Sequence, residues 1–284
     1  MNLIIKEFKG LSISQRFRVV LLGDFHIGNV GCDERLIKEH IRYIKETPDT
    51  YWIDMGDKIE AITRLDKRWD SGSIADWIKL KEIDDLPNVQ AKRYVELVKP
   101  IKDKCLGLII GNHEIKLAQA FSNDVHKRIC YELGVPDLGF LSIVRLKFRR
   151  KNNSNSAVVD IVATHGAGGS LYVGSKINKL NRLANDFVAD VYVCGHHHDK
   201  VSYKKKRIGV NQGDRIVEKS IILCAVPSFF RTYVEGATTY GERNLYSPTS
   251  IGAVKLTIQP FPRDLGVTEK GGWQIRPPDI HLSE

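Results

Sequence analysis

Five apolar runs in this chain each end in a short polar cluster. The runs are 18–23, 51–55, 105–110, 157–164 and 190–194, and the clusters that follow them are Asp24-Phe25-His26, Gly56-Asp57, Gly111-Asn112-His113-Glu114, His165-Gly166 and Gly195-His196-His197-His198. Short apolar runs of this kind are typical of buried strands. Because the loops that follow the carboxyl ends of parallel strands meet at one edge of a sheet, we expect the five clusters to lie close together.

The side chains in these clusters are carboxylates, imidazoles and one carboxamide, and no set of cysteines accompanies them. Mixed nitrogen and oxygen ligands favour manganese, iron or zinc over calcium or magnesium. Two such ions about 3.5 to 4 Å apart can hold the attacking and leaving oxygens of a displacement at phosphorus. The pattern therefore predicts a metal site suited to phosphate-ester chemistry, with a shared carboxylate between two ions.

In chain order the clusters read DFH, GD, GNHE, THG and GHHH. The series resembles the DxH, GD, GNHE or GNHD, His-Gly and GHxH motifs of the calcineurin-like metallophosphoesterase superfamily, and it covers about residues 18 to 199. The resemblance implies an α/β fold of four layers (α/β/β/α), in which two mixed β-sheets pack together and helices flank them. It also implies a hydrolase that cleaves phosphate esters.

The resemblance further implies roles for single side chains. One divalent ion would be held by Asp24, His26, Asp57 and His198. A second ion would be held by Asp57, Asn112, His165 and His196, so that Asp57 bridges the pair. His113 would stabilise the scissile phosphate and protonate the leaving oxygen as the catalytic residue. Manganese is the favoured metal, with iron, zinc or nickel as alternatives.

Each cluster taken alone has a simpler explanation. A Gly-Asp dipeptide is usually a turn, and His165 could be an ordinary loop histidine. Glu114 is expected at a helix start, where its carboxylate faces the positive end of the helix dipole. His197 would point away from its neighbours in an extended loop, which leaves open a role behind a ligand or beside the substrate. The joint occurrence of all five clusters in order favours the metal site.

Composition sets broader limits. The chain has 284 residues and a hydrophobic content of 42%, and it lacks an apolar run near the ~20 residues that span a bilayer. We therefore expect a single domain over 1–284 that is soluble and has no membrane partner. The first residues lack the apolar core of an export signal, and the five cysteines form no CxxC pair. Both features favour a reducing cytoplasm.

A formal net charge of +9 favours polyanionic partners. Basic residues concentrate at 145–151 and 204–207, and Lys67-Arg68 lies in the first long insertion. A solvated face explains such clusters equally well. We predict a phosphate-ester substrate. Phosphodiesters are favoured, and among them nucleic acid (DNA or RNA) most of all, so a nuclease-like activity is expected, with nucleotides as a further possibility. A phosphomonoester or phosphoprotein phosphatase is one alternative. A catalytically inactive, metal-stabilised binding subunit is another, which the intact ligand set and His113 disfavour. The oligomeric state is left open.

Hydrophobic periodicity predicts helices over 33–46, 114–133 and 176–187, and strands over 201–208, 216–226 and 251–258. A hairpin loop is predicted over 147–156. Two segments lie outside the motifs. The first is an insertion over 58–104, with a helical pattern at 89–98, which could cap the metal cleft. The second is an accessory loop over 227–248, whose aromatic and arginine side chains could stack on bases or pack against the sandwich.

Overall fold

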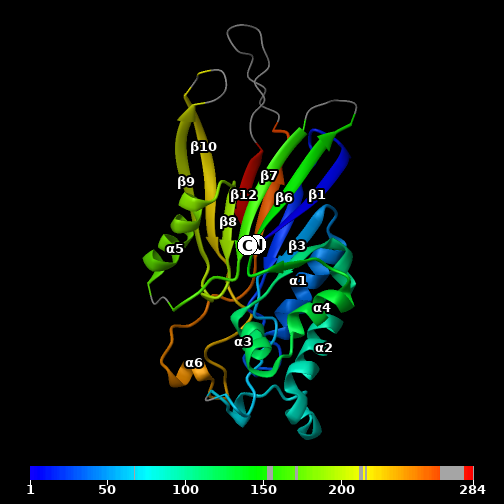
Figure 1. Ribbon diagram of the computed structural model, residues 1–284, viewed down its shortest axis with the longest axis vertical. Helices are drawn as coiled ribbons and strands as arrows, with labels where there is room; N and C mark the ends of the chain where they lie inside the picture. The colour runs from blue at the N-terminus through cyan, green and yellow to red at the C-terminus, as the bar shows by residue number, and fades with distance from the viewer. Residues whose placement is uncertain are drawn as a thin grey trace.

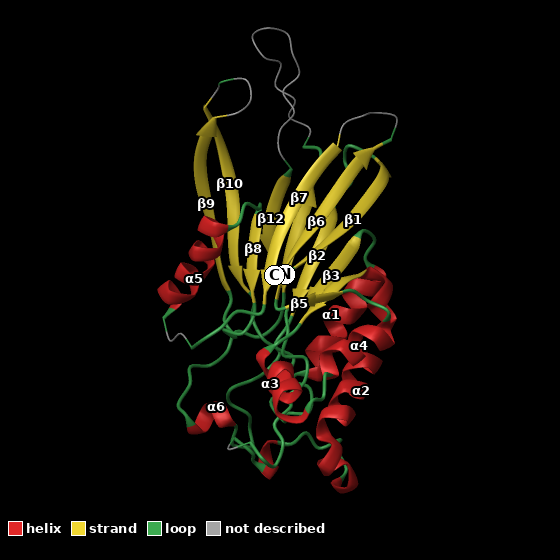
Figure 2. Cartoon of the chain, viewed as in Figure 1, coloured by secondary structure: helices red, strands yellow, loops and turns green. Residues whose placement is uncertain are grey.

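The computed structural model describes residues 1–66, 68–151, 156–169, 172–210, 214, 216–262 and 278–283. Within these residues, twelve strands form two sheets of six strands each, with helices on both outer sides (Figure 1 and Figure 2). Both sheets contain parallel and antiparallel pairs. The predicted α/β fold class, two mixed sheets flanked by helices, is confirmed.

The first sheet has the strand order β1-β6-β7-β8-β10-β9. Its strands are β1 (Asn2–Leu11), β6 (Leu141–Arg150), β7 (Ser156–Thr164), β8 (Val191–Cys194), β10 (Ile216–Ala225) and β9 (Val201–Val210). The second sheet has the order β12-β11-β2-β3-β4-β5. Its strands are β12 (Asp279–Ser283), β11 (Val254–Gln259), β2 (Phe17–Leu22), β3 (Thr50–Asp54), β4 (Cys105–Ile109) and β5 (Asp137–Gly139).

Helices cover the outer face of each sheet. The helices of the described residues are α1 (Glu34–Glu46), α2 (Leu86–Val98), α3 (Asn112–Phe121), α4 (Val125–Leu133), α5 (Val173–Asp186) and the short α6 (Tyr240–Arg243). Of these, α3 and α6 lie below the sheets in Figure 2. Buried side chains of α1, α2 and α4 pack with those of the second sheet. Buried side chains of α5 pack with those of the first sheet. Short 3₁₀ turns at Ser71–Ser73, Leu80–Asp85 and Lys99–Lys104 complete the insertion.

The alternation of side chains along β2 shows why the molecule has four layers. Val19 and Leu21 belong to the hydrophobic cluster between the two sheets, whereas Val20 and Leu22 belong to the cluster under the helices. Successive side chains of a strand point to opposite faces of its sheet. A strand that is apolar at every position therefore has to be covered on both faces, and here a second sheet covers one face and helices cover the other.

The prediction of one helix over 114–133 is wrong, because the chain forms α3 and α4 instead. Ser122 has a left-handed φ of 52° and ends α3. The side chain of Asp124 accepts a hydrogen bond of 3.0 Å from the backbone N–H of Lys127 and begins α4. Leu117 and Ile129 on either side of the break pack in the same hydrophobic cluster. The apolar pattern therefore continues across the break and hides it.

Most other predicted elements are present with shifted ends. The helices predicted at 33–46, 89–98 and 176–187 correspond to α1, α2 and α5, and the late strands to β9, β10 and β11. Gly134 has a left-handed φ of 67° and ends α4. The hairpin loop predicted over 147–156 is shorter, since β6 continues to Arg150, and its tip at 152–155 lies outside the described residues. The edge strands β1 and β12 were not predicted.

The five strands predicted ahead of the polar clusters are β2, β3, β4, β7 and β8. Figure 2 shows that the loops after these strands meet below the sheets, above α3. Among the residues that the structure describes, no helix has the length and apolar content needed to cross a bilayer. All five cysteines, each of them described, are free thiols.

Candidate metal centre

Backbone hydrogen bonds hold the first two polar clusters side by side. The N–H of Asp24 donates to the carbonyl of Gly56 over 2.8 Å, and the N–H of His26 donates to the carbonyl of Asp57 over 3.1 Å. These bonds continue the parallel pairing of β2 with β3 beyond the strand ends. The side chains of both clusters are therefore placed by a rigid scaffold.

Two glycines permit the close packing of the clusters. A Cβ on Gly111 would lie 2.1 Å from both the backbone nitrogen and the Oδ1 of Asp57. Gly56 has a φ of 98°, and a Cβ there would lie 2.5 Å from the Nδ1 of His165. Only glycine fits at either position, because the backbone of one cluster touches the functional side chain of another.

Unusual backbone conformations concentrate in the clusters. Ten non-glycine residues in the described chain have positive φ angles, and five of them are predicted site residues: Asp24 (50°), His26 (51°), Asp57 (50°), His196 (70°) and His198 (48°). A left-handed conformation at a non-glycine residue costs free energy and persists only where the surroundings impose it. Such residues gather at functional sites, so their concentration here indicates one.

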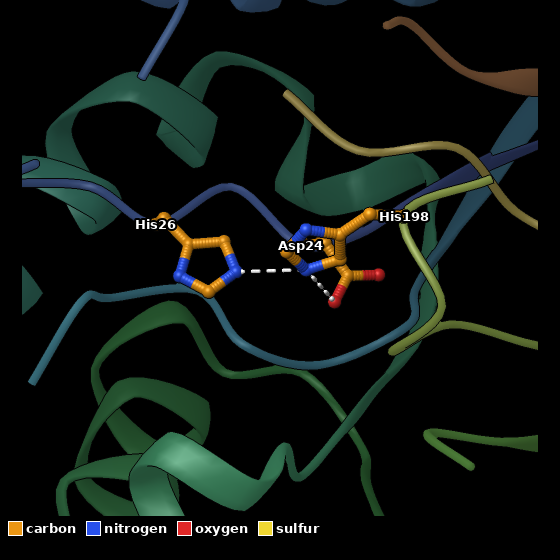
Figure 3. Close-up of side chains that lie close together, drawn as sticks. All are labelled: Asp24, His26 and His198. Atoms are coloured by element: carbon orange, nitrogen blue, oxygen red, sulfur yellow. Dashed lines mark hydrogen bonds and ion pairs between the residues drawn. The ribbon is translucent and has the colours of Figure 1, made fainter. Parts of the chain in front are cut away.

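One group of predicted ligands consists of Asp24, His26 and His198, whose ligand atoms lie within 4.8 Å of one another. The two Nε2 atoms of His26 and His198 are 3.1 Å apart, and the Nε2 of His198 is 3.3 Å from the Oδ1 of Asp24 (Figure 3). Asp24 is fully buried, while the His198 side chain is 22% exposed. Two ring nitrogens facing each other beside a buried carboxylate form a donor set that suits a cation.

A second group consists of Asp57, His165 and His196, again within 4.8 Å. The Nε2 of His165 is 3.2 Å from the Oδ2 of Asp57 and 2.9 Å from the Oδ1 of Asn112. The backbone N–H of His196 donates to the Oδ2 of Asp24 over 2.9 Å, which links this group to the first. The structure thus brings all seven predicted ligands together, with Asp57 in the second group. Its role as a bridge stays a prediction.

Three imidazoles have their Nδ1 atoms held by acceptors that are not among the predicted ligands. His165 Nδ1 is 2.8 Å from the carbonyl oxygen of Met55, and His26 Nδ1 is 2.7 Å from the Oε2 of Glu60. His113 Nδ1 contacts the carbonyl oxygen of Glu60. A proton on each Nδ1 would satisfy these acceptors and leave each Nε2 available on the side of the site. This orientation is the usual one for metal-binding histidines.

The buried charges of the site compensate one another. Burial would raise the pKa of Asp57, but the nearby imidazoles of His165 and His113 outweigh it and hold that pKa well below its usual range. Burial would lower the pKa of His165, but Asp57 raises it to about 10. Burial would likewise lower the pKa of His26, but the hydrogen bond to Glu60 raises it to about 9. Bound cations would take the place of these protons, so the donor set fits divalent metal ions.

His113 lies at the edge of the second group. Its backbone N–H donates to the Oδ1 of Asp57 over 2.9 Å, and its Nε2 is 4.0 Å from the Oδ2 of Asp57. The Nη1 of Arg68 is 3.4 Å from the same Nε2. Arg68 is held by a forked pair with Asp66, at 3.0 Å for Nε to Oδ1 and 2.7 Å for Nη2 to Oδ2. The insertion therefore brings a cation to the predicted catalytic histidine.

Glu114 supports the loops, as expected for a carboxylate at a helix start. Its Oε1 accepts a hydrogen bond of 2.7 Å from the N–H of Lys58, and its Oε2 accepts one of 2.7 Å from the N–H of Gly111. The fully buried ammonium group of Lys58 donates to the carbonyl of Ile109 over 2.6 Å and lies 3.3 Å from Asp54. This buried network lies directly behind the Gly56-Asp57 loop and fixes its position.

Other predicted contributors have different surroundings. His197 belongs to none of the metal-type groups found in the described part of the chain. In the accessory loop, Phe229 is fully buried and stacks on Phe25 with ring centres 5.1 Å apart. Arg231 pairs with Asp33 at 2.5 Å, and Arg243 pairs with Asp70 of the insertion. These contacts indicate that the accessory-loop side chains pack within the protein rather than stack on the bases of a nucleic acid.

The basic clusters lie away from the metal-type groups. Val201 pairs with Ala225 at the site end of the first sheet, whereas Arg207 pairs with Lys219 six residues further along β9. At about 3.3 Å per residue this separation is about 20 Å. Arg149 is likewise at the far end of β6, where it pairs with Glu7 at 2.5 Å.

The sequence reasoning missed two residues of this site, Glu60 and Arg68. Glu60 had one faint signal, since it is a carboxylate three residues after Asp57 and is flanked by the apolar residues Ile59 and Ala61. Arg68 belongs to the basic pair Lys67-Arg68 of the insertion, but the sequence does not show that the path of the insertion brings it to His113.

Known proteins are similar to this chain in structure rather than in sequence. No protein-family model matches the chain, and no curated protein is similar to it in sequence. Solved structures similar to it include a metallophosphoesterase from Sphaerobacter thermophilus, at 13% identity and a TM-score of 0.37 over 76% of this chain and 78% of that chain. The calcineurin-like phosphoesterase YfkN from Bacillus subtilis has 10% identity and a TM-score of 0.36 over 95% and 90% of the two chains.

A third similar structure is Vps29 from Chaetomium thermophilum, with 12% identity and a TM-score of 0.36 over 94% of this chain and 97% of that chain. The first two proteins carry the phosphoesterase names of the superfamily that the sequence motifs resemble. The function is therefore inferred from the geometry of the site.

Proposed function

We propose that this chain is a metal-dependent hydrolase of phosphate esters and that phosphodiesters are its favoured substrates. The observation that carries the proposal is the meeting of two groups of carboxylates and imidazoles at one end of the sandwich, with His113 and Arg68 beside them. Carboxylate and imidazole ligands suit manganese, our favoured metal, and also iron, zinc or nickel. A cytoplasmic location stays a prediction.

In this proposal one ion is held by Asp24, His26, Asp57 and His198. The other is held by Asp57, Asn112, His165 and His196. When bound, such a pair activates a water molecule and neutralises the phosphate oxygens. A donor set of seven side chains, most of them buried, supports two ions better than one, since a single ion takes four to six ligands.

Side chains of the protein position the substrate phosphate and supply a proton to the leaving oxygen. His113 donates the proton on its Nε2 to the leaving oxygen, while the carbonyl of Glu60 holds its Nδ1. Arg68 attracts the phosphate beside His113, and its forked pair with Asp66 keeps the guanidinium in place. A general acid in such a position contributes a rate factor of about 10² to 10⁴.

Among phosphodiesters we favour small, nucleotide-like molecules over long nucleic acids. The basic cluster at 204–207 lies about 10 to 20 Å along β9 from the site end of the sheet, and the accessory-loop arginines pair with carboxylates. The alternative enzymatic function is a phosphomonoester or phosphoprotein phosphatase, because the same metal ligands serve both reactions. The alternative that is not an enzyme is an inactive, metal-stabilised binding subunit.

An activity panel tests the proposal. Protein reconstituted with manganese is assayed with bis(p-nitrophenyl) phosphate, p-nitrophenyl phosphate, and single- and double-stranded DNA. We expect the small diester to be cleaved fastest, and His113→Ala to lower turnover by about 10² to 10⁴ with unchanged metal content. His281→Ala is the matched control, since His281 is exposed on β12.

Each outcome of the activity panel supports one of the candidate functions. Cleavage of the monoester alone would replace the diesterase with a phosphatase. Full metal content without any turnover would contradict the hydrolase and support the binding subunit.

A further inference from the structure

A cavity of about 610 Å³ lies between the insertion and α3, next to the metal-type groups. Its walls include Leu65, Arg68, His113, Lys116, Leu117 and Phe121. A volume of this size is in the range that holds a small-molecule ligand. Nothing in the reaction proposed above uses this space.

The cavity is continuous with the proposed reaction centre through two side chains. His113 and Arg68 both line it. The Nε2 of His113 is also 4.0 Å from the Oδ2 of Asp57, so the imidazole faces the second metal-type group as well. A substrate with its phosphate at that group and its leaving oxygen at His113 would therefore extend its leaving group into the cavity.

The walls combine apolar and cationic side chains. Leu65 and Phe121 face the space although they are 82% and 48% exposed, and Leu117 contributes a buried apolar side chain. Lys116 and Arg68 add positive charge near the phosphate end. An exposed aromatic ring beside cations suits a ligand that has both a planar ring and a phosphate, because rings stack on rings and cations attract phosphate.

We propose that this cavity binds the leaving group of a phosphodiester and that the leaving group contains an aromatic ring, as a nucleoside does. The inference rests on the proposed function. In the reaction a water oxygen bonds to phosphorus and the bond from phosphorus to the leaving oxygen breaks. The proton of His113 passes to the leaving oxygen, a proton from the water restores His113, and the products are a phosphomonoester and an alcohol.

Phenylphosphonate and methylphosphonate test the proposal, because neither has an ester bond to cleave and they differ only in the ring. Calorimetric titration of the manganese-loaded protein measures the affinity of each. We expect phenylphosphonate to bind about 5- to 150-fold more tightly, the range measured for stacking on an aromatic side chain. Phe121→Ala should remove most of this preference. Tyr131→Ala, which removes an exposed aromatic ring from the neighbouring α4, should keep it.

Equal affinities for the two phosphonates, or a preference that survives in Phe121→Ala, would overturn the proposal. Hydrolysis of bis(p-nitrophenyl) phosphate by the same protein is measured in parallel. Hydrolysis without a ring preference would refute only the cavity as a leaving-group site. A ring preference without hydrolysis would refute the proposed function instead.

Discussion

The two ends of the sandwich show two different uses of charge. At the site end, Asp24 and Asp57 are almost completely buried and have left-handed backbones. Further along the first sheet, about 10 and 17 Å from Val201, Lys204 and Lys206 are exposed on β9, and Lys206 pairs with Glu218. Buried charges require specific partners, whereas exposed charges are screened by water and salt. The chemistry of the molecule is therefore placed by burial and backbone geometry, and its net charge of +9 is a poor guide to the site.

The largest expected effect at the site end is that of Asp57→Asn. The carboxylate lies 3.2 Å from His165, and as the proposed bridge it would contact both ions. We expect bound manganese to fall from two ions to less than one per chain, with activity lost below detection. Elemental analysis measures the metal, and Asp103→Asn, at an exposed carboxylate, is the control. Two ions retained in Asp57→Asn would show that Asp57 is no bridge.

Glu60→Gln should have a smaller effect, confined to the group that contains His26. The carboxylate accepts from the Nδ1 of His26 over 2.7 Å. Removing such a partner of a metal ligand typically lowers metal affinity about 10- to 100-fold. Calorimetric manganese titration should show this loss for one ion only. Glu96→Gln on the exposed side of α2 should leave both affinities unchanged, and an equal loss for both ions would contradict the assignment.

Substitution of one glycine at each end of the sandwich compares how tightly the two ends are packed. Gly111→Ala places a Cβ 2.1 Å from Asp57, so we expect the free energy of unfolding to fall by about 1 to 3 kcal/mol. Gly209→Ala on β9 has no atom within 4 Å of the new Cβ. It should leave stability unchanged or raise it by up to about 1 kcal/mol. Urea denaturation of the metal-free proteins measures both, and similar values would show that the site end is not tightly packed.

The smallest effect is expected for removal of charge at the far end. The double substitution Lys204→Gln and Lys206→Gln should change kcat/KM for bis(p-nitrophenyl) phosphate by less than about 2-fold. The two residues lie about 10 and 17 Å along β9 from Val201 at the site end, and both separations exceed the Debye length of about 8 Å. The same assay at two salt concentrations checks the result. A loss of 10-fold or more would mean that substrate reaches this face, as a long nucleic acid would.

The sequence predicted the parts of the molecule in which local pattern and tertiary structure agree. Apolar runs such as 18–23 became central strands because they are buried on both faces. The clusters after them lie together because parallel strands end at one edge. The edge strand β1 escaped prediction for the opposite reason. In β1 only Phe8 and Leu11 are buried, so its pattern is too weak to indicate a strand.

The parts of the site that the sequence could not predict depend on long-range geometry. Glu60 reaches His26 because pairing between the two motif loops continues to Ile27 and Ile59. Arg68 reaches His113 only through the fold of the insertion. The break between α3 and α4 depends on one residue, Ser122, in a conformation that composition does not reveal.

The most direct test of the central claim is the anomalous diffraction of crystals grown with manganese. The account predicts two anomalous peaks about 3.5 to 4 Å apart. One should lie among Asp24, His26 and His198, and the other among Asp57, His165 and His196. Fully occupied manganese elsewhere with no peak between these side chains would contradict it.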